Sequence, residues 1–66
     1  MNKVKVYRGA KKISQLELAR SVGVSRQTID MIENDKYNPS LKLAMDIAKV
    51  FHVTVEELFE FVDDEK

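Results

Sequence analysis

Four consecutive residues with hydrogen-bonding side chains, Ser25 to Thr28 (Ser-Arg-Gln-Thr), carry the clearest chemistry in this sequence. An arginine can bond guanine O6 and N7, and a glutamine amide can bond adenine N6 and N7. The major groove of DNA displays these groups in a different pattern for each base pair. A helix that begins at Ser25 would therefore place Arg26, Gln27 and Thr28 where they can contact bases.

Two short helical patterns hinged at Gly23 would position these residues. Residues 14–17 (Ser-Gln-Leu-Glu) form a capping box that begins the first helix, and Gly23 can adopt the left-handed conformation that ends it. The second pattern spaces Ile29 and Ile32 three residues apart, on a face that can pack inward. Residues 15–34 therefore predict a helix-turn-helix, whose second helix enters the major groove with its N-terminal residues.

Three further helices are expected around this pair. Residues 3–12 alternate at first like a strand, but their apolar side chains can share one buried side, which favours a helix. Pro39 excludes helical backbone in the preceding residue, so the next helix begins at Ser40 and ends at His52. Residues 54–57 form a second capping box that begins the last helix. The predicted fold class is all-α, a compact five-helix bundle, and it allows a short extended C-terminal tail or strand.

Length and composition bound the function. A chain of 66 residues forms a single domain, 1–66, near the lower limit for a self-sufficient core. The sequence has no cysteine and one histidine, His52, so we expect no metal site, no cofactor and no enzyme active site. No stretch approaches the roughly 18 apolar residues of a membrane span, and no signal peptide is evident. A cytoplasmic protein without membrane contact is expected.

The charge is unevenly distributed along a chain whose net charge is zero. Residues 1–37 contain eight Lys and Arg against four Asp and Glu, a net charge of +4. Residues 38–66 contain three against seven, a net charge of −4. Such a separation can orient a protein on a polyanion such as DNA.

Three segments form a recognisable pattern: I-S-Q-L-E-L-A-R-S-V-G-V-S-R-Q-T-I-D-M-I-E-N, then K-Y-N-P-S-L-K-L-A, then V-E-E-L-F. Together they resemble the lambda-repressor-like (Xre/Cro) helix-turn-helix regulators, closest to short stand-alone dimeric members such as the cytolysin-operon repressor. The resemblance covers residues 4–59 and leaves residues 60–66 as an acidic tail.

The resemblance implies a role for individual residues. It implies base contacts by Arg26, Gln27, Thr28 and Met31, where Met31 would make apolar contact with a thymine methyl. It implies phosphate contacts by Gln15, Ser25, Asn34, Lys36, Tyr37 and Asn38. Gln15 would also brace the recognition helix, and Arg8 would form a partly buried ion pair with Glu33. The alternative is that these are ordinary surface residues, with the Thr28 methyl packed beneath the helix.

Apolar residues near the C-terminus suggest a second copy as partner. The end of so small a bundle has more of them than it can bury. Leu58 and Phe59 fit the core, and three residues are also assigned to a dimer interface: Leu58, Phe61 and Val62. A two-fold dimer would present recognition helices about 34 Å apart to half-sites about 10 bp apart. The alternative is a frayed tail without a partner.

These observations predict a sequence-specific regulator of transcription that binds double-stranded DNA. We expect a repressor that binds a palindromic operator as a homodimer. The alternative is an antitoxin-like protein-interaction partner that also binds DNA, and a protein antagonist or toxin is a further partner that the sequence allows.

Overall fold

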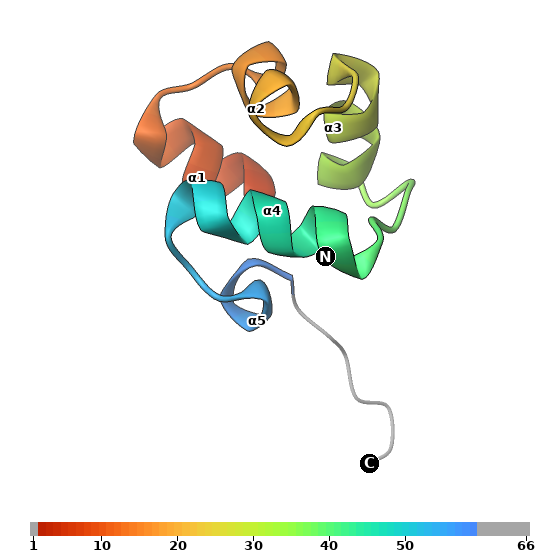
Figure 1. Cartoon of the computed structure of the whole chain (residues 1–66). Coiled ribbons are helices and arrows are strands. Elements are labelled where there is room, and N and C mark those ends of the chain that lie inside the picture. Colours follow the sequence, from red (N-terminus) through yellow and green to blue (C-terminus); the bar gives the residue numbers. More distant parts are fainter. Residues whose placement is uncertain (1, 60–66) are drawn as a thin grey trace.

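The computed structural model describes residues 2–59 of the chain, and it confirms the predicted all-α five-helix fold (Figure 1). The helices are α1 (Val4–Lys11), α2 (Gln15–Val22), α3 (Arg26–Glu33), α4 (Leu41–Phe51) and α5 (Val55–Leu58). Over residues 2–59, extended pairing is limited to one antiparallel bridge between Asn2 and Phe59. None of the described helices is long and apolar enough to cross a membrane.

Helix α4 occupies the middle of the bundle. In Figure 1 the α2–α3 pair lies above α4, α1 lies behind it, and α5 lies below it. α4 packs against α1, α2 and α5, while α3 packs against α1 and α2. The helix-turn-helix is therefore supported from below by the rest of the chain, and its upper side faces solvent.

All five helices contribute to one apolar core. The largest fully buried side chains come from every helix: Val4, Leu18, Ile29, Ile32, Ile47 and Leu58. Burial stabilises each such side chain by about 1.5–3 kcal/mol relative to exposure. Since helices α1 to α3 have only eight residues each, too few to persist alone in water, this shared core is what maintains them.

The ends of the helices follow the signals in the sequence. The hydroxyl groups of four predicted N-cap residues accept the expected backbone hydrogen bonds: Ser14, Ser25, Ser40 and Thr54. Gly23 ends α2 in the left-handed conformation with φ 76°, and His52 ends α4 with φ 58°, both as predicted. Lys12 ends α1 in the same way, with φ 60°, and nothing in the sequence pointed to it.

The C-terminal end of the described chain corrects one assignment. Leu58 was expected in a dimer interface, but it is fully buried within the chain's own core. It has no exposed surface to offer a second copy, so its role is structural. Its carbonyl oxygen accepts a 2.8 Å hydrogen bond from the Lys3 amide, and Phe59 continues in extended conformation. The other two predicted interface residues, Phe61 and Val62, lie outside the described residues.

Candidate nucleic-acid interface

The turn between α2 and α3 is held by backbone hydrogen bonds to one residue. The amides of Gly23 and Val24 both donate to the carbonyl oxygen of Ala19, the latter at 3.0 Å. Ala19 is fully buried, and its small side chain lets two helices approach closely. These contacts set the angle at which α3 leaves α2.

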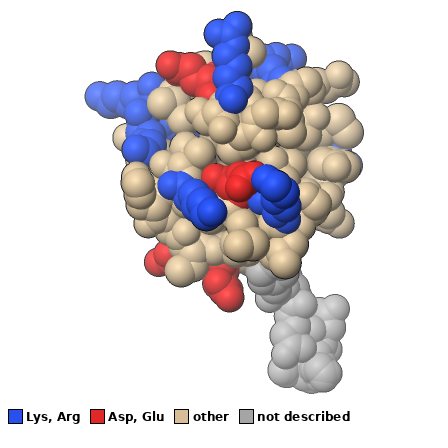
Figure 2. Space-filling model, viewed as in Figure 1, with Lys and Arg blue, Asp and Glu red and all other residues tan. Residues whose placement is uncertain are grey.

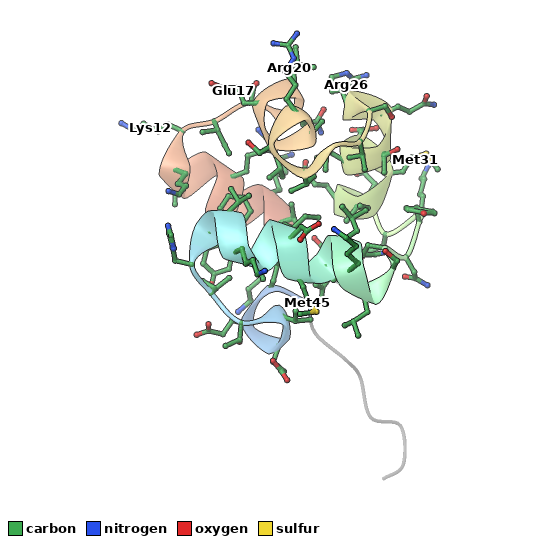
Figure 3. All side chains as sticks on the ribbon, viewed as in Figure 1. Lys12, Glu17, Arg20, Arg26, Met31 and Met45 are labelled. Carbon is green, nitrogen blue, oxygen red and sulfur yellow. The ribbon has the colours of Figure 1, made fainter. Side chains whose placement is uncertain are left out.

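The N-terminus of α3 presents two exposed polar side chains, those of Arg26 and Gln27. Ser25 caps this end: its hydroxyl oxygen accepts from the Thr28 amide at 3.1 Å and lies 2.9 Å from the Thr28 hydroxyl. Thr28 is half-buried, and its hydroxyl is paired with its neighbour. Met31 is also half-buried and lies further along the outer side of α3 (Figure 3). Arg26 and Gln27 are therefore the predicted base-contacting residues that are most available to a ligand.

Gln15, at the start of α2, binds three residues of α3. Its amide nitrogen donates to Asp30 Oδ1 at 3.1 Å and to Glu33 Oε1 at 3.0 Å. Its amide oxygen accepts from Arg26 Nη1 at 2.7 Å. Gln15 therefore braces the recognition helix, and Asp30 contributes to this bracing. Both amide hydrogens are directed to carboxylates in this structure, and the predicted phosphate contact of Gln15 stays a prediction.

The predicted ion pair of Arg8 and Glu33 ties α1 to the end of α3. Arg8 Nε lies 2.7 Å from Glu33 Oε2, and Arg8 Nη2 donates to Glu33 Oε1 at 3.3 Å. A third donor, Arg8 Nη1, bonds the carbonyl oxygen of Ile13 at 3.1 Å. The Glu33 side chain is only 3% exposed, and these donors compensate for the burial of its polar oxygens. The pair fixes geometry, while desolvation offsets much of its attraction.

The remaining predicted phosphate contacts lie at the end of α3 and in the loop that follows it, and they form two groups. The Asn34 side-chain nitrogen donates to the Asp30 carbonyl oxygen at 2.8 Å and to Asp30 Oδ1 at 3.3 Å, so this amide closes the end of the helix. The other side chains lie exposed on the loop surface: Lys36, Tyr37 and Asn38. Asp35 adopts a positive φ of 57°.

Asn2 makes structural hydrogen bonds that were not predicted from the sequence. Its side-chain nitrogen donates to the Ile32 carbonyl oxygen at 2.8 Å and to Asp35 Oδ1 at 3.0 Å, while its oxygen accepts from the Val4 amide at 3.1 Å. The N-terminal segment thus fixes the end of the recognition helix. A contact between residues 2 and 32 leaves no periodic signal, because it depends on the assembled tertiary structure.

Basic side chains project from the same side as the N-terminus of α3. Arg20 and Arg26 both point away from the bundle at its upper edge (Figure 3). In Figure 2, Lys and Arg side chains lie at the upper and left edges and over the middle of this face, while Asp and Glu side chains lie at the upper edge, in the middle and at the lower end. Arg20 was not among the predicted contacts, and its position makes it a further candidate for contact with phosphate.

Similarity to known proteins agrees with this geometry. Residues 4–58 match the family described as helix-turn-helix (HTH_3). The chain is 55% identical over 64 residues to an uncharacterized HTH-type transcriptional regulator of Methanocaldococcus jannaschii, with 97% of each chain covered. It is 48% identical over 63 residues to such a regulator of Archaeoglobus fulgidus, covering 96% of this chain and 90% of the relative. A relative in Bacillus subtilis is 47% identical over 58 residues, or 88% of each chain. The chain therefore belongs to the Xre/lambda-repressor-like helix-turn-helix family, and it is a DNA-binding regulator of transcription and not an enzyme.

Proposed function

We propose that this chain is a sequence-specific repressor that binds a palindromic operator in double-stranded DNA as a homodimer. The observation that carries the proposal is the N-terminus of α3, where Arg26 and Gln27 are exposed on a helix braced by Gln15 and Glu33. Base readout requires such a helix, since hydrogen bonds to base edges depend on direction. As a DNA-binding regulator, it would act in the cytoplasm, as the sequence predicts.

The contacts divide into those that read bases and those that bind the backbone. Gln27 contacts an adenine, Arg26 contacts a guanine, and Met31 packs against a thymine methyl. Phosphates are contacted from the loop by Lys36, Tyr37 and Asn38, and near the turn by Ser25. Thr28 also contacts a base, but less directly than Arg26 and Gln27, because its hydroxyl group is already hydrogen-bonded to that of Ser25.

Exposed apolar residues support a protein partner, and the proposed partner is a second copy. Leu41 and Met45, four residues apart on α4, leave 70% and 44% of their surface exposed. Two further apolar residues are assigned to this interface, Phe61 and Val62, and both lie outside the described residues. The rival proposal is an antitoxin-like protein, in which these apolar residues bind a toxin. A gene for a small toxin next to this one would favour the rival.

Footprinting on the promoter region of its own gene tests the DNA part of the proposal. At two salt concentrations, we expect protection of one defined inverted repeat, with affinity falling as salt rises because phosphate contacts release counterions. If no defined site is protected, the proposal of sequence-specific DNA binding is wrong.

Sedimentation of Phe61→Lys tests the dimer. The added charge should weaken a dimer interface, so the variant should sediment as a monomer at concentrations where the unmodified chain is dimeric, and operator binding should weaken with it. Phe61→Leu is the matched control, which keeps an apolar side chain and should remain dimeric. Unchanged dimerisation of Phe61→Lys would reject this interface.

A further inference from the structure

We propose that Asn2 is a positioning residue for the phosphate contacts of the loop that follows α3. Its side-chain amide holds Asp35 in the left-handed conformation from which residues 36–38 leave the helix. The inference rests on the proposed function, in which this loop contacts phosphates. It assigns Asn2 to affinity for DNA of any sequence, because phosphate contacts carry no sequence information.

Two backbone hydrogen bonds turn the chain at the end of α3. The Lys36 amide donates to the Met31 carbonyl oxygen at 2.8 Å. The Asp35 amide donates to the Ile32 carbonyl oxygen at 3.1 Å. This pair of bonds forms a Schellman motif, in which the first residue beyond the helix end adopts the left-handed conformation. That residue is Asp35, with φ 57°, so the direction in which the loop leaves α3 depends on its conformation.

Asp35 requires support in this conformation. A Cβ atom makes the left-handed region costly, and glycine is therefore the usual residue at this position of a Schellman motif. Aspartate is tolerated better than most residues because its short side chain can form hydrogen bonds. In this structure Asp35 Oδ1 accepts from Asn2 Nδ2 at 3.0 Å. The residue with the least favourable backbone in the loop is thus tied to the N-terminal segment.

Asn2 is itself held on all sides of its amide group. Its nitrogen also donates to the Ile32 carbonyl oxygen at 2.8 Å, and its oxygen accepts from the Val4 amide at 3.1 Å. The nitrogen therefore faces two acceptors and the oxygen faces a donor, which fixes the orientation of the amide. The backbone of Asn2 forms the antiparallel bridge with Phe59. Asn2 can therefore act as a fixed point from which the start of the loop is held.

A held loop favours contact with the DNA backbone. The side chains of Lys36, Tyr37 and Asn38 are exposed, and the loop that carries them would lose conformational entropy on binding if it were free. Because Asn2 and the Schellman motif order its first residues before DNA is present, less entropy is lost when Lys36 meets a phosphate. Asn2 would thereby raise affinity without touching DNA.

Asn2→Ala tests this role through the salt dependence of binding. Affinity is measured on the selected operator and on an unrelated duplex of the same length, over a range of salt concentrations. Asn2→Ala should weaken binding to both duplexes by the same factor, about as much as Lys36→Ala does, and reduce the salt slope by about 1. In the Lys36→Ala background it should reduce the salt slope no further.

Asp35→Gly and Asp35→Ala form a matched pair that tests the backbone argument. Both remove the same carboxylate, but only glycine adopts the left-handed conformation without a Cβ. Asp35→Gly should keep the Lys36 contact, and Asn2→Ala should have no effect on the salt slope in that background. Asp35→Ala should have a slope lower by about 1 than that of Asp35→Gly. His52→Gly relieves the same conformation at the end of α4, with φ 58°, and should rescue nothing.

Amide hydrogen exchange of Lys36, followed by NMR, measures the loop without DNA. Loss of the Asn2 side chain should speed this exchange by about tenfold, and Asp35→Gly should restore it. Asn2→Ser keeps an oxygen for the Val4 amide and lacks the amide donors, so it should behave like Asn2→Ala. It keeps the test available if thermal unfolding, followed by circular dichroism, shows that Asn2→Ala is not folded.

Three results would overturn the inference. The first is an unchanged salt slope in Asn2→Ala and Asn2→Ser. The second is a rescue by Asp35→Gly that is no better than the rescue by Asp35→Ala. The third is a loss of preference for the operator over the unrelated duplex, which would mean that Asn2 acts on the base contacts. Failure of the proposed function would look different, because the unmodified chain would then select no sequence and Lys36→Ala would leave the salt slope unchanged.

Discussion

The two sides of this bundle share one apolar core and differ in the polar contacts that join their helices over residues 2–59. On the side of α2 and α3, side chains from different helices are joined by directional hydrogen bonds, such as those of Gln15 and those between Arg8 and Glu33. On the side of α4 and α5, buried apolar residues predominate, Leu58 among them, and the chain end is tied by backbone contacts to residues 2 and 3.

The difference follows from what each side is proposed to do. Contact with base edges requires fixed directions, and hydrogen bonds supply direction. Association with a second chain through apolar residues depends mainly on buried area, because the hydrophobic effect is non-directional. The molecule therefore maintains exact geometry where it would meet DNA, and leaves Leu41 and Met45 exposed at the other side.

Glu33→Ala should have the largest effect, because it removes the centre of the polar network. The Arg8 side chain, only 17% exposed, would lose its counter-charge, and breaking a buried pair in this way costs about 3–5 kcal/mol. In a domain of this size, that is much of the total free energy of unfolding. Urea unfolding measures the loss.

Asp46→Ala is the matched control for that variant. Asp46 pairs with Lys42 at 2.8 Å on α4, but the lysine side chain is 85% exposed. An exposed pair of this kind should cost no more than about 0.5 kcal/mol. Equal losses for Asp46→Ala and Glu33→Ala would contradict the contrast between the two sides.

Leu58→Ala tests the apolar side and should rank second. Leu58 is fully buried, so the cavity should lower the free energy of unfolding by about 2–5 kcal/mol. Leu41→Ala is the matched control, since Leu41 is 70% exposed and should change the free energy of unfolding by less than about 0.5 kcal/mol. If Leu58→Ala weakened dimerisation and left monomer stability unchanged, its assignment to the core would be wrong.

Gln27→Ala should have a smaller effect, and only on DNA binding. Loss of a bidentate base contact should reduce the preference for the operator over unrelated DNA by about tenfold to a hundredfold, with no loss of thermal stability, since Gln27 is exposed.

Lys36→Ala, in the loop, should instead weaken binding to all sequences equally and reduce the salt slope by about 1. Competition binding at several salt concentrations separates the two, and equal loss on all sequences for Gln27→Ala would remove it from the base contacts.

Local signals in the sequence were enough to predict the helices and the turn. The capping boxes at Ser14 and Thr54 act over three residues, and the conformations of Gly23 and His52 depend on one residue each. Such features are visible without tertiary structure. They predicted the five helices and the position of Arg26 and Gln27 at an exposed helix start.

Long-range polar contacts could not be predicted in the same way. The hydrogen bonds of Gln15 to Asp30 and Glu33 were not predicted, because these residues are distant from it in sequence and close only after folding. The bridging role of Asn2 has the same origin. Leu58 was misplaced because an apolar residue near the chain end fits a core or an interface equally well, and only packing distinguishes the two.

Selection of binding sites from a library of random duplexes is the most direct test of the central claim, that α3 reads sequence as part of a two-fold dimer. If this claim is right, the unmodified chain enriches one inverted repeat with half-site centres about 10 bp apart. A selected pool with no shared sequence, or one with a single unrepeated half-site, would contradict it.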